Sequence, residues 1–322
     1  MAQLEVVPFS DEHLDAAAAL LAARHARHRQ AEPLLPERYE DPSAAREELE
    51  HVWRADGASG AAGFRDGRFV GYLLGARREQ PIWGDNTWVE AAGHAVEEAE
   101  DVRDLYGAAA GRWVEEGRPR HWALVPAHDK DVLDAWWRVT FGQQHAHGIQ
   151  EIEPGAEVAV PDGFEIREPR EAEIEQLIDV DLALPQHQGR SPVFGGHGEV
   201  TREDSREEWL KTFASGEEKI LIGACDGRAV ACWAFVPAEE SREHVGVLRA
   251  DHACFLGFAS TLPEARGSGI GVALTQAGFA WAAEEGYSTM LTDWRVTNLL
   301  ASRFWPRRGF RTSFLRLYRS VP

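Results

Sequence analysis

The sequence predicts an α/β protein built from two tandem copies of one fold unit. Short apolar runs typical of strands alternate with segments in which apolar residues recur every three to four positions, as they do in helices. A glycine-rich loop, Arg266–Gly271, follows one such strand and begins a helix. Short sequences of the first half also recur, in the same order, in the second half. These features together indicate a duplicated chain whose second copy carries a binding loop.

The clearest repeat is a predicted hairpin turn. Asp66-Gly67-Arg68 lies between two apolar runs, and Asp226-Gly227-Arg228 lies between two more. Asp-Gly between strand-like runs is typical of two-residue β-hairpins. Proline and glycine concentrate in the segment 154–163, as they do in linkers. We therefore predict two domains, 1–157 and 161–322.

The elements of the second half follow from its apolar periodicity. In order they are a strand at 164–167, a helix at 170–184, a loop at 185–197, a helix at 202–215, strands at 220–225, 229–236 and 252–260, a helix at 269–285, a strand at 287–292, a helix after Asn298 and a strand at 312–319. The last strand is expected to complete the second domain.

The composition is that of an acidic chain with few cysteines. Among its 322 residues, 53 Asp and Glu against 34 Lys and Arg give a formal net charge of -19. This charge argues against nucleic acid as a partner, because phosphates are bound through basic residues. The three cysteines have no metal-binding spacing, and no apolar run reaches the roughly 18 residues that a membrane span needs. We expect a cytoplasmic protein with reduced thiols, no metal and no membrane contact, and a homodimer remains open.

The glycine-rich loop has the features of an anion site. It follows the apolar run Ala253–Ser260 and contains Arg266, Gly267, Gly269 and Gly271. Glycines let the backbone approach a ligand closely, and the first N–H groups of a helix have no intrahelical partner. The helix dipole and a guanidinium add positive charge. The loop is therefore predicted to hold a pyrophosphate.

Two familiar phosphate loops do not fit this segment. A P-loop requires a lysine after its last glycine, and there is none here. A dinucleotide-binding fingerprint requires Gly-x-Gly-x-x-Gly directly after the strand, whereas Gly271 falls one position early and Thr261–Arg266 intervenes. The roughly 50 residues that follow are also too few for a doubly wound sheet.

The loop and a second motif closely resemble the GNAT superfamily of N-acyltransferases. Pro263, Arg266, Gly267, Gly269, Ile270, Gly271 and Leu274 match its acyl-CoA-binding motif, and Asn298, Ala301, Trp305, Gly309 and Phe310 match the spacing of the motif that follows the next strand. The two motifs stand in the family's order and at its separation. The resemblance covers the second half of the chain.

The resemblance implies two GNAT-like domains, each with a mixed, mostly antiparallel sheet flanked by helices. In the family, acyl-CoA enters where two central strands splay apart. The implied function is an N-acetyltransferase that moves the acetyl group of acetyl-CoA to an amine of a small molecule or peptide, by direct attack on the thioester. The alternative is a non-catalytic acyl-CoA-binding or sensor protein on the same fold.

The resemblance also assigns site residues. The cofactor-binding residues it implies are Phe258, Ala259, Ser260, Thr261, Arg266, Gly267, Ser268, Gly269, Ile270, Gly271, Asn298 and Arg303. Asn298 is equally suited to cap the next helix. The acceptor site is expected to include His187 and Phe194.

The acid and the base are less well defined by the sequence. Trp305 stands where the family commonly has a tyrosine general acid, and an indole cannot protonate a thiolate; Tyr318 or a water is the remaining source of that proton. Asp251 and His252 are the predicted general base, because a histidine beside a carboxylate titrates in the useful range. Glu239, Glu240 and Asp293 are the competing candidates.

The first copy has lost the loop. Aligning the shared Glu-Glu-Gly sequences of the two halves sets four acidic residues, Glu97, Glu98, Glu100 and Asp101, opposite Arg266, Gly267, Gly269 and Ile270. Carboxylates at these positions would repel a pyrophosphate. The first domain is therefore predicted to be a degenerate copy that acts as a scaffold.

Overall fold

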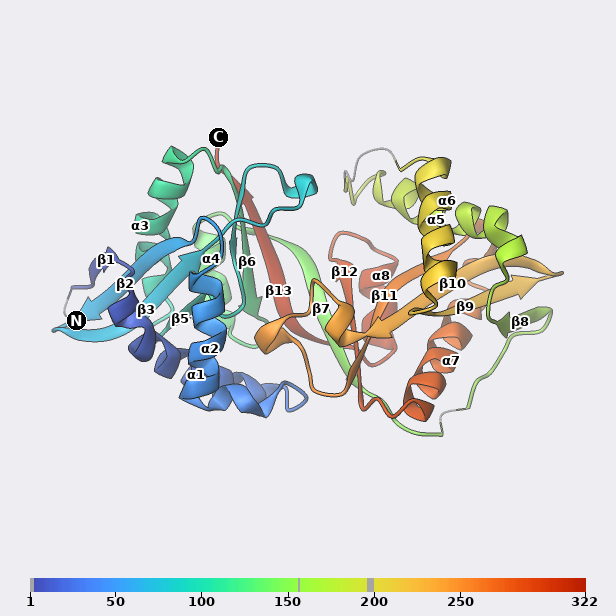
Figure 1. Cartoon of the computed structure of the whole chain (residues 1–322), viewed down its shortest axis with the longest axis horizontal. Helices are drawn as coiled ribbons and strands as arrows, with labels where there is room; N and C mark the ends of the chain where they lie inside the picture. Colours follow the sequence, from blue (N-terminus) through green and yellow to red (C-terminus); the bar gives the residue numbers. More distant parts are fainter. Residues whose placement is uncertain (1–2, 156, 196–199) are drawn as a thin grey trace. The chain divides into compact units, whose positions relative to one another are not determined.

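The computed structural model describes residues 3–155, 157–195 and 200–322. The chain forms two compact units (Figure 1). The first contains residues 1–147, 245–249 and 312–322, and the second contains residues 148–244 and 250–311. Both units combine helices with β-sheet, as the sequence predicts.

The first unit contains two sheets. Its elements are β1 (Glu5–Pro8), α1 (Leu14–Ala31), α2 (Pro42–Trp53), β2 (Ser59–Arg65), β3 (Arg68–Gly75), β4 (Asn86–Val89), β5 (His94–Val96), α3 (Asp101–Glu115), β6 (Arg120–Pro126), α4 (Lys130–Arg138), the start of β7 (Gly142–Glu151) and nearly all of β13 (Arg311–Ser320). One sheet has the antiparallel order β1-β2-β3-β5. In the other, β6 pairs with β4 in parallel and with β13 antiparallel.

The second unit repeats this strand order. Its elements are β8 (Phe164–Arg167), α5 (Ile174–Gln188), α6 (Arg202–Ser215), β9 (Lys219–Cys225), β10 (Arg228–Pro237), β11 (Ala253–Thr261), α7 (Ile270–Glu284), β12 (Thr289–Arg295) and α8 (Ala301–Arg307). Its strands lie in the order β8-β9-β10-β11-β12, and all pairs are antiparallel except β11 with β12. The run β8-β9-β10-β11 matches β1-β2-β3-β5 of the first unit.

The two predicted hairpin turns have the same geometry. Asp66 and Gly67 have φ of 51° and 75°, and Asp226 and Gly227 have φ of 50° and 75°. Positive φ at both central residues is the requirement of a type I′ turn, which explains the choice of Asp-Gly. The turns join β2 to β3 and β9 to β10, so the sequence repeat corresponds to a structural repeat.

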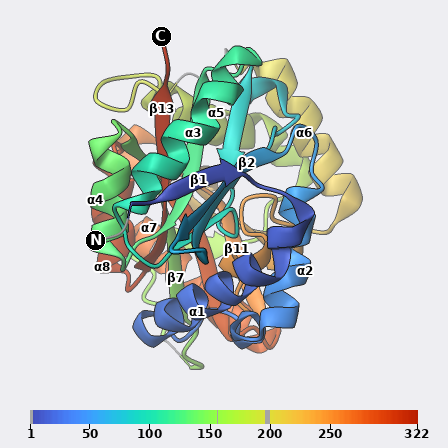
Figure 2. The same ribbon diagram turned by 90° about the vertical axis from the view of Figure 1, so that its left-hand side faces the viewer.

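The core of the first unit is built on alternating faces of β2 and β3. Ala62, Tyr72 and Leu74 are buried in one cluster with residues of α1 and α2. On the opposite face a methyl group at Gly71 would lie 3.2 Å from Leu105 of α3. Figure 2 shows α3 on one side of these strands and α1 and α2 on the other. Successive side chains of a strand point to opposite faces, so both layers are needed to cover the sheet.

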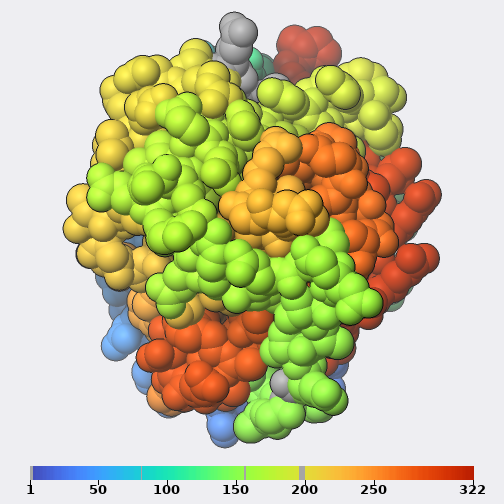
Figure 3. Space-filling view, turned by 90° about the vertical axis from the view of Figure 1, so that its right-hand side faces the viewer, coloured from blue at the N-terminus to red at the C-terminus, as the bar shows by residue number. Residues whose placement is uncertain are grey.

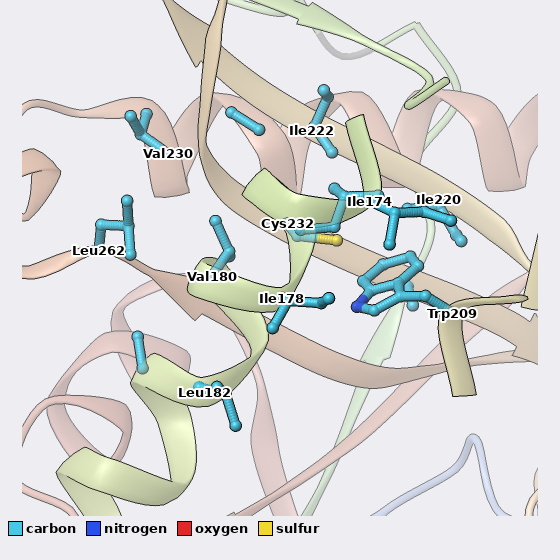
Figure 4. Close-up of a cluster of buried hydrophobic side chains, with 14 of the residues drawn as sticks. Ile174, Ile178, Val180, Leu182, Trp209, Ile220, Ile222, Val230, Cys232 and Leu262 are labelled. Atoms are coloured by element: carbon cyan, nitrogen blue, oxygen red, sulfur yellow. The ribbon is translucent and has the colours of Figure 1, made fainter. Parts of the chain in front are cut away.

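The second unit is also covered on both faces. Ile220 and Ile222 of β9 are buried with Val180 of α5 and Trp209 of α6 (Figure 4). On the other face α7 packs so closely that a methyl group at Gly278 would lie 2.1 Å from Phe235 Cζ of β10. The sheet is therefore enclosed between α5 and α6 on one side and α7 on the other.

Most predicted elements of the second half are present, with shifted ends. The strand at 164–167 and the helix at 202–215 have the predicted bounds, and α6 begins with a capping box between Thr201 and Asp204. Helix α5 starts at Ile174 after a single 3₁₀ turn and continues through Pro185 to Gln188, so the predicted loop from 185 begins later. His197, at the end of that predicted loop, lies outside the described residues. Pro185 lies inside this helix and lacks the N–H for one helical hydrogen bond, yet the helix continues for three more residues.

The last strand differs most from expectation. Residues 312–322 belong to the first unit, where Leu317 pairs with Ala123 of β6. The segment 245–249, between β10 and β11, also belongs to the first unit; a methyl group at Gly246 would lie 1.8 Å from Glu48 Oε1. The two compact units therefore do not coincide with the two halves of the sequence.

In the described part of the chain, no helix combines the length and apolar character that a bilayer span requires.

Candidate functional site

A gap opens between the two parallel strands of the second unit. The pairing of β11 with β12 ends at Leu256 and Thr292, although β11 continues to Thr261 and β12 to Arg295. The register between β10 and β11 shifts at the same level, leaving Gly257 as an extra residue in β11. Such a bulge bends a strand and increases its twist. The resemblance to the GNAT fold led us to expect central strands that splay apart, and these strands do so.

The glycine-rich loop follows β11 directly and is anchored on both faces of the sheet. Leu262 and Ala265 are buried in the cluster that contains α5. Ile270, 1% exposed, lies on the opposite face, where a methyl group at Gly223 of β9 would approach its Cγ1 to 2.4 Å. These apolar anchors hold the ends of the loop and leave residues 266–268 exposed between them.

The exposed part of the loop has the form of a cradle, defined here as residues 266–271. Gly267 and Gly269 have φ of 80° and 96°, which favour glycine over other residues. A methyl group at Gly267 would have no heavy atom within 4 Å, so the space beside this backbone is open. The orange segment that carries the cradle reaches the surface of the second unit in Figure 3.

The polar side chains of the cradle are held by hydrogen bonds to the backbone of the same loop. Arg266 is exposed, and its Nε donates to the carbonyl of Thr261 at 3.2 Å, leaving the rest of the guanidinium at the surface. Ser268 Oγ donates to the carbonyl of Ala265 at 2.8 Å and accepts from the N–H of Ile270 at 3.3 Å. Helix α7 begins at Ile270, and its first N–H groups with their dipole suit an anion.

The residues of β11 before the cradle alternate between faces. Ser260 is buried, and its Oγ donates to the carbonyl of Val180 in α5 at 2.6 Å. Phe258 is half-buried against the same cluster. Ala259 and Thr261 therefore lie on the α7 face. Of the predicted contacts in this strand, the hydroxyl of Ser260 is already used within the protein.

We expect Ser260→Ala to lower the free energy of unfolding by about 1 kcal/mol while leaving the affinity for acetyl-CoA unchanged, because the change removes one buried hydrogen bond to α5. Urea unfolding and calorimetric titration measure the two quantities. Thr261→Ala, on the other face of the same strand, is the matched variant. An affinity loss in Ser260→Ala alone would show that its hydroxyl turns toward the ligand.

Asn298 joins the helix α8 to the predicted acceptor residue His187. Its Oδ1 accepts from the backbone N–H groups of Leu300 and Ala301 at 3.1 and 3.4 Å, so it caps α8. The same oxygen lies 3.1 Å from His187 Nε2, which must therefore be the donor. Asn298 has the capping role, and a contact with the cofactor remains a prediction.

The segment after α5 is held against the end of β12. Arg295 Nε donates to Gln188 Oε1 at 3.2 Å. A methyl group at Gly195 would lie 2.8 Å from the Arg295 guanidinium carbon, so the chain passes close to it. Phe194 has a positive φ of 46° and is 72% exposed, so its ring is available on the surface. His187 is thus placed beside the α8 cap, whereas Phe194 is not packed against it.

The predicted base lies at the other end of β11 from the cradle. Asp251 and His252 form an exposed turn before the strand, whose nine residues span about 30 Å. This end of β11 is still paired with β12. Asp293, by contrast, directly follows Thr292, the last paired residue, and so stands where the gap opens.

The aromatic residues considered for the general acid both pack against other rings. Trp305 is buried and meets Phe310 edge to face, with ring centroids 5.5 Å apart. Tyr318 belongs to the first unit, where its ring lies 4.8 Å from that of Trp122. Arg303 is exposed on α8, as a contact with a phosphate would require.

In the first unit, side chains fill the region that corresponds to the gap between β11 and β12. Strands β5 and β6, which match β11 and β12, lie in different sheets. His94 Nε2 is 3.1 Å from the carbonyl of Leu124 and donates to it, so the imidazole bridges the two strands. Arg24, buried in the same region, donates to the carbonyls of Ala91 and His94.

The acidic residues that stand opposite the cradle in the alignment of the two halves are engaged in ion pairs. Arg65 pairs with Asp101 and, at 3.2 Å, with Glu98, while Arg68 pairs with Glu97. Glu100 pairs with Arg103 and Arg138. Asp101 is buried, and this burial raises the pKa of its carboxyl. The segment is a closed, acidic start of α3 without a glycine cradle.

The described residues contain no group of three or more His, Cys, Asp or Glu side chains placed to hold a metal ion. The three cysteines are free thiols. Burial raises the pKa of Cys254 to about 12 and raises that of Cys232 as well, so neither is suited to act as a nucleophile.

A splayed pair of parallel strands followed by a glycine cradle at a helix start is the arrangement that the resemblance to the acyl-CoA-dependent N-acyltransferases implies, and the helix start suits a phosphate group. Residues 185–310 match the acetyltransferase (GNAT) family. The second half of the chain therefore carries a GNAT-family domain. No curated protein sequence matches the chain.

Solved structures share the fold over the whole chain. A GCN5-related N-acetyltransferase from Sphaerobacter thermophilus is 15% identical, with a TM-score of 0.60 over 99% of this chain and 96% of that one. A tandem GNAT protein from the clavulanic acid biosynthesis pathway is 14% identical, with a TM-score of 0.53 over 99% of each chain. A GCN5-related glucosamine N-acetyltransferase region of a fungal multi-domain β-N-acetylglucosaminidase is 14% identical, with a TM-score of 0.55 over 99% of this chain and 38% of that one. These likenesses establish a tandem GNAT fold.

Proposed function

We propose that this protein is an N-acetyltransferase that uses acetyl-CoA and acetylates an amine of a small molecule or peptide. The proposal rests on the cradle, which follows β11 after that strand is no longer paired with β12. A pyrophosphate site and a path for the pantetheine arm then lie in one place. Arg266 and the N–H groups of the three cradle glycines, Gly267, Gly269 and Gly271, would hold the pyrophosphate, since those of Ser268 and Ile270 already donate within the loop.

The proposed reaction is direct transfer. The neutral amine attacks the thioester carbonyl carbon, a C–N bond forms, the C–S bond breaks and CoA leaves as its thiolate. The proton of the attacking nitrogen passes to a base or to water. With a pKa near 8.5, a thiol is a tolerable leaving group without full protonation, so the buried Trp305 does not prevent the reaction.

Turnover separates the enzyme from the alternative, a non-catalytic acyl-CoA-binding or sensor protein. The purified protein would be incubated with acetyl-CoA and a panel of polyamines, aminoglycosides, glucosamine and peptides, with thiol release and product mass as readouts. We expect acetylated product with at least one amine. Tight acetyl-CoA binding without product from any amine would favour the sensor, for which the absent tyrosine is the supporting observation.

For the base we expect Asp293→Asn to lower kcat about 100-fold and His252→Ala to leave it within about twofold. Asp293 stands where the gap opens, whereas His252 lies several residues before that point. A pH profile of kcat/KM for both variants measures the effect. If His252→Ala abolishes the increase of kcat/KM with rising pH and Asp293→Asn does not, the predicted pair Asp251 and His252 is the base.

We propose that the first unit does not bind acyl-CoA. The bridging imidazole of His94 and the ion-paired carboxylates of Glu97 and Asp101 occupy the places that the gap and the cradle have in the second unit. The unit would then serve as a scaffold, and one cofactor site per chain is expected.

A further inference from the structure

Two buried side-chain donors in the described part of the second unit have no acceptor, Arg308 Nε and Trp233 Nε1. Trp233 of β10 is 4% exposed, and its Nε1–H has no hydrogen-bond partner among the residues that the structure describes. Leaving a buried donor unsatisfied costs free energy, and most buried polar groups are paired for that reason. A phenylalanine at this position would fill much of the same space without that cost.

The ring of Trp233 lies under the first turn of α7. The position that a methyl group would take on Gly271 is 3.3 Å from Cη2 and 3.6 Å from Cζ2 of Trp233. Cζ2 is separated from Nε1 by one ring carbon, so the edge near the N–H faces this turn. The same position on Gly271 is 3.7 Å from Cε2 of Phe304 in α8. The indole thus reaches from β10 toward the space between α7 and α8.

Trp233 also stands beside the gap along the strand. It is paired with Ala259 of β11, which lies between Leu256, where β11 leaves β12, and the cradle. A ligand with its pyrophosphate in the cradle and its thioester toward Leu256 has its pantetheine arm at the level of Ala259. The amide carbonyls of that arm are hydrogen-bond acceptors.

We propose that the indole N–H of Trp233 donates a hydrogen bond to an amide carbonyl of the pantetheine arm of the bound acyl-CoA. The inference rests on the proposed function, because it needs an acyl-CoA in the cradle. The N–H of Trp233 has no acceptor among the described residues, and the arm of a bound acyl-CoA would supply one. Trp233 is then a positioning residue that sets how far the arm extends toward the thioester end.

The first test is calorimetric titration of Trp233→Phe with two probes. We expect its affinity for acetyl-CoA to fall about fivefold, the effect of one neutral hydrogen bond. Its affinity for adenosine 3′-phosphate 5′-diphosphate, which has the phosphates but no arm, should be unchanged. Trp281→Phe is the matched control, because Trp281 lies on α7 against Tyr287, 6.0 Å between ring centroids, and away from the cradle. Equal losses in both variants would overturn the inference.

A second measurement is made on the unaltered protein. The ¹⁵N-labelled indole signal of Trp233 should shift when acetyl-CoA is added and stay in place when adenosine 3′-phosphate 5′-diphosphate is added. The signal is assigned by its disappearance in Trp233→Phe or, if that variant does not fold, in Trp233→Tyr. No shift with acetyl-CoA, or equal shifts with both probes, would contradict an arm contact. If the unaltered protein does not bind acetyl-CoA at all, the proposed function fails; if it binds and the signal does not move, only the role of Trp233 fails.

Discussion

Gly267→Glu is expected to abolish acetyl-CoA binding, with an affinity loss of at least about 100-fold. Gly267 has φ of 80° and open space beside it, so the new carboxylate would stand in the cradle itself. Two like charges about 4 Å apart repel by roughly 1 to 4 kcal/mol, depending on the local dielectric, and a pyrophosphate carries more than one charge. Arg266→Glu should act in the same direction. Calorimetric titration measures both, beside the single site per chain expected for the unaltered protein.

The chain offers a matched control for this variant. Gly227, in the hairpin turn of the same unit, has φ of 75° and no atom within 4 Å of an added methyl group. Gly227→Glu therefore introduces the same charge and the same backbone strain outside the cradle, and its affinity should stay unchanged. Retained binding in Gly267→Glu would place the cofactor elsewhere, and two sites per chain would contradict the scaffold role of the first unit.

The second large effect is a loss of stability of the first unit below neutral pH. Five histidines in its described residues are buried, and for four of them burial lowers the pKa, to about 4 for His25, about 2 for His28, about 3 for His94 and about 4 for His121. His121 is bonded through both ring nitrogens, with Nδ1 2.8 Å from the Tyr106 hydroxyl and Nε2 2.8 Å from the carbonyl of Arg118. Nε2 must donate to the carbonyl, and Nδ1 of a neutral ring can accept from the hydroxyl, so both nitrogens of the neutral form have partners.

The sign follows from the lowered pKa values. Above pH 6.5 these histidines are neutral in both the folded and the unfolded state. Below pH 6.5 they bind protons in the unfolded chain but stay neutral in the folded unit. The free energy of unfolding therefore falls as the pH falls. Each histidine contributes up to about 1.4 kcal/mol per pH unit, and four together can remove several kcal/mol between pH 6.5 and 5.5. The carboxyls of Glu48 and Asp101, whose pKa values are raised by burial, act in the opposite direction.

Urea unfolding at pH 7.5, 6.5 and 5.5 measures this slope. His28→Gln, which keeps an N–H donor without a titrating ring, should reduce the slope by about one proton, whereas His252→Gln, at an exposed position, should leave it unchanged. Equal stability at pH 7.5 and 5.5 would mean that the buried imidazoles are already charged in the folded unit.

Features that depend on local sequence were predictable. The Asp-Gly turns and the cradle require positive φ, and glycine marks such positions in the sequence. The capping box of Thr201 and Asp204 likewise marks the start of α6. The splayed strands followed from the family resemblance rather than from any periodicity. Local patterns thus identified where the cradle lies in the chain.

Features that depend on distant partners were not predictable. Nothing within residues 312–319 distinguishes a strand of the second unit from one that pairs with β6. The Ser260 hydroxyl donates to the carbonyl of Val180 in α5, a partner 80 residues away in the sequence. That the N–H of Trp233 has no acceptor among the described residues likewise follows only from the three-dimensional structure. The His94 bridge needed both β5 and β6 in position. Periodicity assigns a residue to a face but does not name what covers that face.

The position of β13 has a consequence for synthesis in the cell. Arg316 of β13 donates to Gln144 of β7, 172 residues earlier, and both lie in the first unit. At translation rates of roughly 5 to 20 residues per second, β6 waits about 10 to 40 seconds for β13. During that time the strand presents an unpaired edge, which favours aggregation. The first unit is begun first on the ribosome but is completed only when nearly the whole chain has been made.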